Sequence, residues 1–344
     1  MNIRSYALMF LFITGAWTGC QQSEKAPDVS GIPMDVQLSR FDEAFIGLDT
    51  NHLQVGLEEL NSAYPVFFPV YMNNIMNFPY HGDSTSAQVE AALKQYLGSP
   101  DIHNLQDSVR AHFGDRQMGR LEAGLTKSFR YIKYYLPDFH PPRVVTFTSA
   151  LSNFGAITVD SVLGIGLDMF MGAEFPLYKQ IPNPYPGYIL KQFTAENIIG
   201  SAVRVIAQDR YPPPQKGTLL DQMVAQGKLL YFLDKTMPDS PDSIKIHYST
   251  RELAWCKKNE QFIWQYFIRN NLLYKTEALT IRYYIGPSPS SKGMPAEAPG
   301  DIGSWVGWQI VRKYMDTHPD TRLSDLMQLT NGQQLLNEAG YKPH

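Results

Sequence analysis

Apolar residues recur every three or four positions along most of this chain, which is the spacing of one face of an α-helix. Between residues 115 and 136, Leu121, Leu125 and Phe129 lie on one stripe that stops at Pro137. Proline removes a backbone donor from a helix interior, so it marks the end of this segment. The spacing predicts helices at residues 101–113, 115–136, 194–208, 218–233, 250–269 and 301–315.

The middle of the chain follows a different pattern. Residues 143–148, 156–160 and 162–167 are rich in β-branched and apolar side chains and are short, which is typical of β-strands. Gly164 and Gly166 in the last of them permit close approach of another backbone. We expect a small sheet with an exposed or edge strand near its end. The fold class is therefore expected to be α+β, predominantly α-helical, with one small sheet plus helices.

The first 20 residues have the organisation of an export signal. Arg4 supplies a positive charge, residues 6–13 are apolar, and small residues precede Cys20. The apolar run is too short to span a bilayer, which favours a signal peptide. A glycine–cysteine junction resembles a lipobox, in which the cysteine thiol is acylated and becomes the new N-terminus. Trp17 stands where lipoboxes usually carry leucine.

This interpretation sets the domain organisation. Residues 1–19 would be a lipoprotein signal peptide, and residues 20–31, which are mostly polar and lack periodicity, would be a tether. Residues 32–344 would form a single globular domain, with a subdivision allowed near residues 138–185. Each acyl methylene that enters the membrane contributes about 0.8 kcal/mol, so several chains on Cys20 would anchor the protein firmly.

Composition narrows the class of protein further. The chain is 44% hydrophobic and carries a formal net charge of −3, so it can bury a sizeable core and gives no reason to expect nucleic acid as a partner. It has two cysteines. Cys256 lies on an apolar helix face, where a buried free thiol is the simplest interpretation.

The motifs of common catalytic sites are missing from the sequence. None of the eight histidines is followed by glutamate, and no two lie four positions apart, so the helical zinc-protease signature is absent. Asp160 and Asp168 flank the strand at 162–167 and could form an acid–base pair, but solvated or turn-capping carboxylates are favoured. Trp305 and Trp308 lie on one side of a helix, where core packing is favoured over a binding groove.

Several runs, taken together, resemble a known family. The chain is similar to gliding motility-associated lipoproteins of the GldB type, from about residue 32 to the C-terminus. The runs that carry the resemblance are residues 32–36, 40–42, 64–69, 132–137, 167–172, 210–214 and 299–312.

The resemblance implies a component of the Bacteroidetes gliding apparatus, whose parts overlap with or support type IX secretion. It also implies an architecture like that of the gluzincin zinc peptidases, in which an edge strand (here 162–167) precedes a metal-binding helix (here 196–208). After Glu196 that helix has no histidine and no carboxylate through Ile206. Divalent metal ligands are imidazoles or anions, so we expect a degenerate site that holds no metal.

The expected cleft of such a protein would hold an extended peptide by main-chain pairing along residues 162–167. Its expected partners are the membrane, through the lipid on Cys20, and proteins of the cell envelope; the body would face the periplasm from either membrane. This covalent lipid is the only cofactor expected. The expected cleft residues are Ile165, Asp168, Ser201, Arg204, Trp305 and Trp308.

Three functions stay open on the sequence alone. The favoured one is a non-catalytic binding or scaffold lipoprotein, in effect a pseudo-peptidase. The second is a lipoprotein hydrolase with an unrecognised site, whose metal ligands would come from scattered residues such as His103, His112 and His140. The third is a lipoprotein that binds a small ligand or glycan, which would require an exposed aromatic platform.

Overall fold

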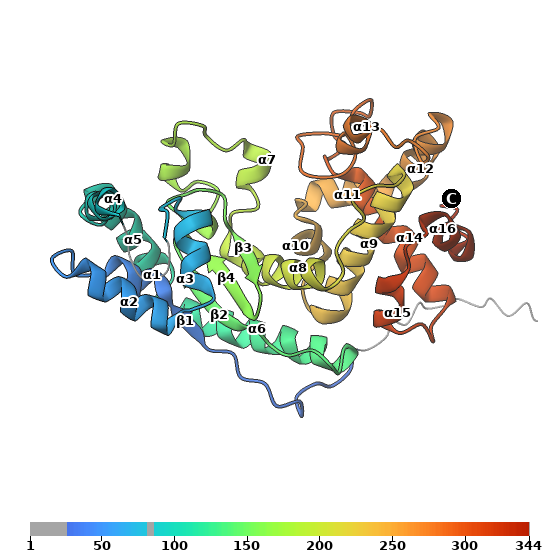
Figure 1. The fold of residues 1–344 in the computed structure, drawn as a ribbon. Coiled ribbons are helices and arrows are strands. Elements are labelled where there is room, and N and C mark those ends of the chain that lie inside the picture. The colour runs from blue at the N-terminus through green and yellow to red at the C-terminus, as the bar shows by residue number, and fades with distance from the viewer. Residues whose placement is uncertain (1–25, 81–85, 344) are drawn as a thin grey trace, which may run out of the picture.

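The computed structural model describes residues 26–80 and 86–343. A four-stranded sheet lies between two groups of helices (Figure 1). Helices α1–α5 lie on one side of it, α8–α16 lie on the other, and α6 runs beneath the sheet toward the second group. Cys20 and the expected signal peptide lie outside the described residues.

The helices have the following bounds. They are α1 (Phe41–Ile46), α2 (Leu53–Ala63), α3 (Phe67–Val70), α4 (Ala87–Leu97), α5 (Pro100–His112), α6 (Asp115–Tyr135), α7 (Gly187–Leu190), α8 (Ile198–Arg210), α9 (Leu219–Thr236), α10 (Asp242–Ile246), α11 (Thr250–Lys258), α12 (Glu260–Arg269), α13 (Ala278–Arg282), α14 (Ile302–Thr317), α15 (Leu323–Gln328) and α16 (Gly332–Ala339).

The strands are short and form one mixed sheet. They are β1 (Leu38–Arg40), β2 (Arg143–Phe147), β3 (Ala156–Val159) and β4 (Val162–Gly166), in the order β1-β2-β4-β3. β2 is parallel to both β1 and β4, whereas β3 is antiparallel to β4. The predominantly helical α+β class predicted from the sequence is thus confirmed.

The strand order corrects one expectation. β4 has a neighbour on each side, so it is an inner strand and not the edge, and its backbone groups already pair with β2 and β3. A peptide cannot add to β4 by main-chain pairing, so that part of the expected cleft is wrong. The error has a physical cause, because the hydrophobicity of a strand does not specify which neighbours it acquires.

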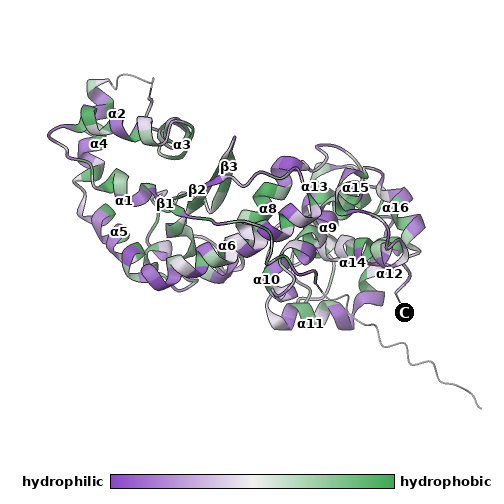
Figure 2. Ribbon diagram, turned by 90° about the horizontal axis from the view of Figure 1, so that it is seen from below, coloured by the Kyte–Doolittle hydropathy of each residue, from purple (hydrophilic) through white to green (hydrophobic). Residues whose placement is uncertain are grey.

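Two apolar clusters hold the fold together. The smaller joins α1–α4 to one face of the sheet through edge-to-face aromatic pairs, such as Phe41 with Phe67 and with Tyr71. The larger contains α6, the other face of β4 and most of α8–α16. The apolar stripe predicted on α6 faces this cluster, and apolar and polar positions alternate along the helix in Figure 2.

Helices α9 and α14 form the centre of the larger cluster. α9 is buried along most of its length, and the two helices approach closely at Gly227 and Gly307. A Cβ atom on Gly307 would lie 1.7 Å from the carbonyl oxygen of Met223, so only glycine permits this approach. Burial on most sides of a helix is typical of a core element. Within the described residues, none of the helices combines the length and apolarity that a bilayer crossing requires.

Candidate functional site

The six expected cleft residues do not lie together in a cleft. Ile165, Asp168 and Trp308 are fully buried, and Trp305 is 1% exposed. Both tryptophans belong to the core, so the core interpretation is confirmed and their place in the expected cleft is wrong. Ser201 is partly buried on α8, and Arg204, one turn further along, is the member of the set that lines a cavity.

Asp168 fixes the loop that follows β2. Its carboxylate accepts hydrogen bonds from the Ser149 backbone at 2.9 Å, from the Leu151 backbone at 2.7 Å and from the Ser149 hydroxyl at 3.1 Å. Ala150 and Leu151 have left-handed backbones, with φ of 52° and 64°, which cost energy that these bonds offset. Burial raises the pKa of Asp168 to about 6 although the hydrogen bonds oppose the rise.

This geometry settles the role of the carboxylate pair flanking β4. Asp160 is exposed at the turn between β3 and β4, at the opposite end of β4 from Asp168. Five strand residues span about 16 Å, which is too far for the two groups to act on one bond. Asp168 caps a turn as expected, but it is buried and not solvated.

Trp308 takes part in a buried polar network instead of a groove. Its indole Nε1 donates to the Asp234 carboxylate at 2.8 Å. Asp234 also accepts from Lys245 at 2.9 Å and from Arg312, whose guanidinium lies 3.7 Å from the ring centroid of Trp308. The cations compensate the partly buried carboxylate of Asp234, and Asp242 is a second acceptor for Arg312. The network joins α9, α10 and α14.

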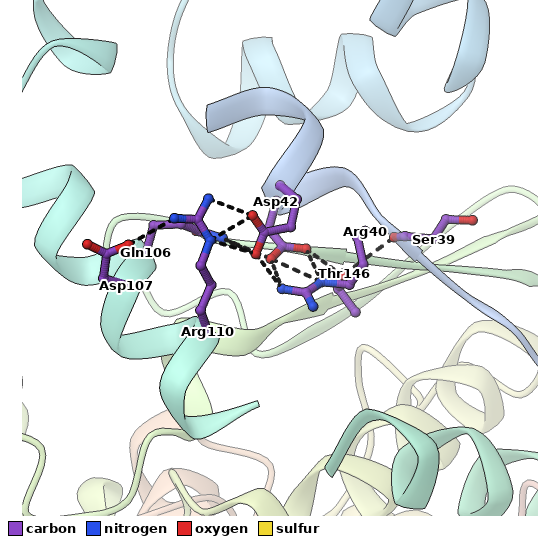
Figure 3. A network of polar contacts seen from close by, with 8 residues as sticks. Ser39, Arg40, Asp42, Gln106, Asp107, Arg110 and Thr146 are labelled. Carbon is purple, nitrogen blue, oxygen red and sulfur yellow. Dashed lines mark hydrogen bonds and ion pairs between the residues drawn. The ribbon is translucent and has the colours of Figure 1, made fainter. Parts of the chain in front are cut away.

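A second network, at the other end of the fold, joins the first strand to the helices beside it (Figure 3). Asp42 is 1% exposed and accepts from Arg40 at 2.6 Å, from Thr146 at 2.6 Å and from Gln106 at 3.1 Å. Burial opposes ionisation, but these donors hold the pKa of Asp42 below its usual value. The network ties α1, α5 and β2 together.

The best candidate for a functional site is a cavity of about 250 Å³ that α8 lines together with α9 and the ends of α10 and α14. The lining is mixed, with apolar and polar surface and side chains of both charges. Its lining residues are Tyr188, Lys191, Gln192, Arg204, Gln208, Gln226, Ile246, His247, Tyr248, Ile285, Gly286, Pro287, Ser288, Gly300 and Asp301.

Arg204 is incompletely paired in this cavity. Its Nη2 donates to the carbonyl oxygen of Lys245 at 2.6 Å, but its Nε is buried and has no hydrogen-bond partner. Burial lowers the pKa of Arg204, and the negative charge of Asp301 partly offsets this effect. An unpaired buried donor costs about 1–3 kcal/mol, so an acceptor that reached Nε would recover that energy.

The other ionisable groups of the cavity are already positioned. Asp301 accepts from the Gly286 backbone at 2.7 Å and from the Ser304 hydroxyl, and burial raises its pKa. Burial, assisted by the positive charges of Arg204 and Lys191, lowers the pKa of His247 to about 3, so its imidazole is neutral at pH 7. Both His247 and Asp301 have left-handed backbones, with φ of 59° and 58°. Strain of this kind concentrates at functional sites.

These residues do not fit a zinc ion. The wall of the cavity contains the cations Arg204 and Lys191, which repel a metal ion, and the imidazole of His247 has no second imidazole beside it in the lining. Across residues 26–80 and 86–343, no three histidine, cysteine or carboxylate side chains group as metal ligands would. His103, His112 and His140 are each exposed.

Sequence reasoning found Arg204 but missed His247, Asp301 and Lys191. Asp301 was visible in the run at 299–312, and His247 was one of eight histidines, but neither carries a local motif. Their common place in the cavity depends on contacts between segments about 40–110 residues apart. No local signal could have found them.

Comparison with known proteins agrees with the resemblance seen in the sequence. The family described as gliding motility protein GldB matches residues 22–343, which is nearly the whole chain. No curated protein and no solved structure matches. The chain therefore belongs to the GldB family of gliding motility lipoproteins.

Proposed function

We propose that this protein is a non-catalytic component of the gliding apparatus and of the type IX secretion machinery linked to it, held at the membrane by lipid on Cys20. In this proposal, the cavity beside α8 captures a segment of an envelope protein. The observation that carries the proposal is Arg204 in the cavity wall, whose buried Nε has no hydrogen-bond partner.

The chemistry of the cavity supports an acceptor-bearing partner. A guanidinium has five N–H donors and no acceptor, so a carbonyl or carboxylate oxygen is the group that completes Arg204. His247 is neutral, and Gln208 and Gln226 offer further donors and acceptors along the same wall. Asp301 keeps the local charge from becoming strongly positive. A peptide carbonyl or a single carboxylate suits this wall better than a multiply charged phosphate.

Three features support a binding role over a hydrolytic one. The cavity residues do not fit zinc, the base strength of His247 is strongly reduced, and the Asp301 carboxylate is already engaged by two donors. A general base works best with a pKa near the operating pH, which His247 does not have. The hydrolase alternative remains a distinct outcome of the experiment below.

The test compares complementing variants in a gliding strain whose chromosomal gene has been deleted. Arg204→Met keeps the side-chain length and removes the donors, and Gln208→Trp leaves the guanidinium in place and narrows the cavity. We expect both variants to reach the membrane at normal levels and to fail to restore single-cell gliding. The matched control is Arg120→Met, at an exposed position on α6, which should restore gliding fully.

The same proteins separate binding from catalysis. The purified full-length protein, in detergent and without chelator, is tested for metal content by elemental analysis and for cleavage of a peptide library. We expect no turnover. Turnover that Arg204→Met abolishes would make the cavity an active site and would overturn the non-catalytic role. Normal gliding in both cavity variants would overturn the role of the cavity itself.

A further inference from the structure

A second cavity, of about 460 Å³, lies between the proline-rich end of α8, one face of α9 and the connection from α15 to α16. It shares no lining residue with the cavity beside α8. Residues 210–214 form one wall and residues 327–330 the other. The floor is mainly apolar, with Val224, Ala225 and Leu229 of α9 at 3%, 7% and 1% exposure.

One cation lies in this apolar floor. Lys228 is 8% exposed, and its ammonium donates to the carbonyl oxygen of Met327 at 3.0 Å and to that of Leu329. An ammonium has three N–H donors, so two are used. In the part of the chain that the structure describes, no carboxylate pairs with Lys228. Burial lowers the pKa of this lysine to about 8.

We propose that this cavity is a binding site for an apolar monocarboxylate of the fatty-acid class, with the third N–H of Lys228 as the partner of the carboxylate. Small-molecule sites are typically cavities of about 300–1,000 Å³ with apolar walls and a few placed polar groups, which describes this cavity. The tail would lie against the α9 residues and the proline wall. The carboxylate would compensate a buried charge that the protein leaves without a counter-ion.

The charges around the cavity favour one orientation and a single negative charge. Arg210, Tyr211 and Asp221 are the other ionisable groups in the lining. Arg210 is engaged by Asp138. Asp221 lies seven residues before Lys228 on α9, about 10 Å along the axis, and would repel a carboxylate placed at its end. A dianion such as phosphate would leave one charge uncompensated in an apolar floor, so the monoanion is favoured.

Lys228 also has a structural role, because its two bonds tie α9 to the C-terminal end of α15. If the role of Lys228 were only structural, a carboxylate group on a ligand would not increase its affinity for the cavity. Our proposal predicts that binding needs both the apolar volume and the ammonium. The ligands tested must therefore separate the effect of the hydrocarbon tail from that of the carboxylate.

The experiment is isothermal titration of the full-length protein at pH 7 with octanoate, octanol and acetate. We expect octanoate to bind at least tenfold more tightly than octanol and acetate not to bind measurably. Lys228→Met should reduce octanoate affinity at least tenfold, whereas Lys258→Met, an exposed lysine at the end of α11, should not change it. Octanol binding as tight as octanoate, or no octanoate binding at millimolar concentration, would overturn the proposal.

A second variant covers the case in which Lys228→Met fails to fold. Ala225→Leu leaves the ammonium in place and fills part of the cavity, so it should also lose octanoate binding. Proton linkage gives a third readout on the unaltered protein. Near pH 8 the lysine is partly neutral, so octanoate should bind with uptake of a proton, whereas at pH 6 it should bind with none. An equal, non-zero uptake at both pH values would show that a group other than Lys228 takes up the proton and would contradict contact between Lys228 and the carboxylate.

Discussion

Replacing Gly307 by alanine tests the packing at the centre of the fold. The new Cβ would lie 1.7 Å from the carbonyl oxygen of Met223 on α9 and 2.3 Å from its carbonyl carbon. Ordinary contact begins near 3.4 Å, so α9 and α14 would have to separate by about 1.7 Å at their crossing. Both contacts are to backbone, so no side chain can rotate away.

The size of the stability loss in Gly307→Ala follows from two opposing effects. Overpacking a tightly filled core typically costs about 1–3 kcal/mol, and this contact belongs at the upper end because a helix must move. Alanine is the better helix former by about 1 kcal/mol, which offsets part of the loss. We therefore expect the free energy of unfolding to fall by about 2 kcal/mol. With a denaturant slope of about 3 kcal/mol per molar urea, the midpoint should fall by about 0.7 M.

The matched control is Gly119→Ala on α6. Gly119 is exposed, and a Cβ added there would have no neighbour within 4 Å. The same substitution should therefore raise the free energy of unfolding by about 0.5–1 kcal/mol. Urea unfolding followed by circular dichroism measures both variants. If Gly307→Ala were as stable as Gly119→Ala, the close crossing of α9 and α14 would be refuted.

Three further predictions concern buried polar groups. Asp234→Asn should lower the free energy of unfolding by about 3 kcal/mol because it leaves the buried ammonium of Lys245 without a carboxylate, whereas Arg312 keeps Asp242. Asp325→Asn, in an exposed pair, should change the free energy of unfolding by less than about 0.5 kcal/mol, and equal urea midpoints for the two variants would contradict the prediction. Burial raises the pKa of Asp168 to about 6, so folding favours its protonated form and its contribution to stability falls as the pH rises through about 6. Relative to Asp168→Asn, the wild-type protein should therefore lose stability between pH 4 and 7. Parallel stability profiles of the two proteins over this pH range would refute the inference. Burial raises the pKa of the Cys256 thiol, so it should react with a thiol reagent only after unfolding, and rapid labelling of the native protein would show that it is accessible.

Local patterns predicted the helices well. The stripe on α6 placed that helix within one residue of its observed end, and the helices predicted at 218–233 and 301–315 match α9 and α14 to within about three residues. One predicted helix, 250–269, is in fact two. Asn259 lies between α11 and α12 and donates its side-chain amide to the carbonyl of Trp255, which ends the first helix. Asparagine competes for backbone groups in this way, but periodicity does not register it.

The sheet and the cavities depend on long-range contacts. β1 has only three residues and pairs with β2 more than 100 residues later, so no local pattern marked it. The inner position of β4 was missed for the same reason. Arg204 gained its significance only when α10 and α14 brought His247 and Asp301 beside it. Lys228 is one of several polar residues along α9, and its burial could not be inferred from the sequence.

Capture of an envelope partner by the cavity beside α8 is the central claim about this protein's function. The direct measurement is photo-cross-linking in living cells from a photoreactive residue at Gln208, with and without Arg204→Met, and from Arg116 on α6 as an exposed control. We expect a discrete adduct from Gln208 with an envelope protein, its loss in Arg204→Met, and no such adduct from Arg116. An adduct that persists unchanged in Arg204→Met, or no adduct from Gln208 in gliding cells, would contradict the account.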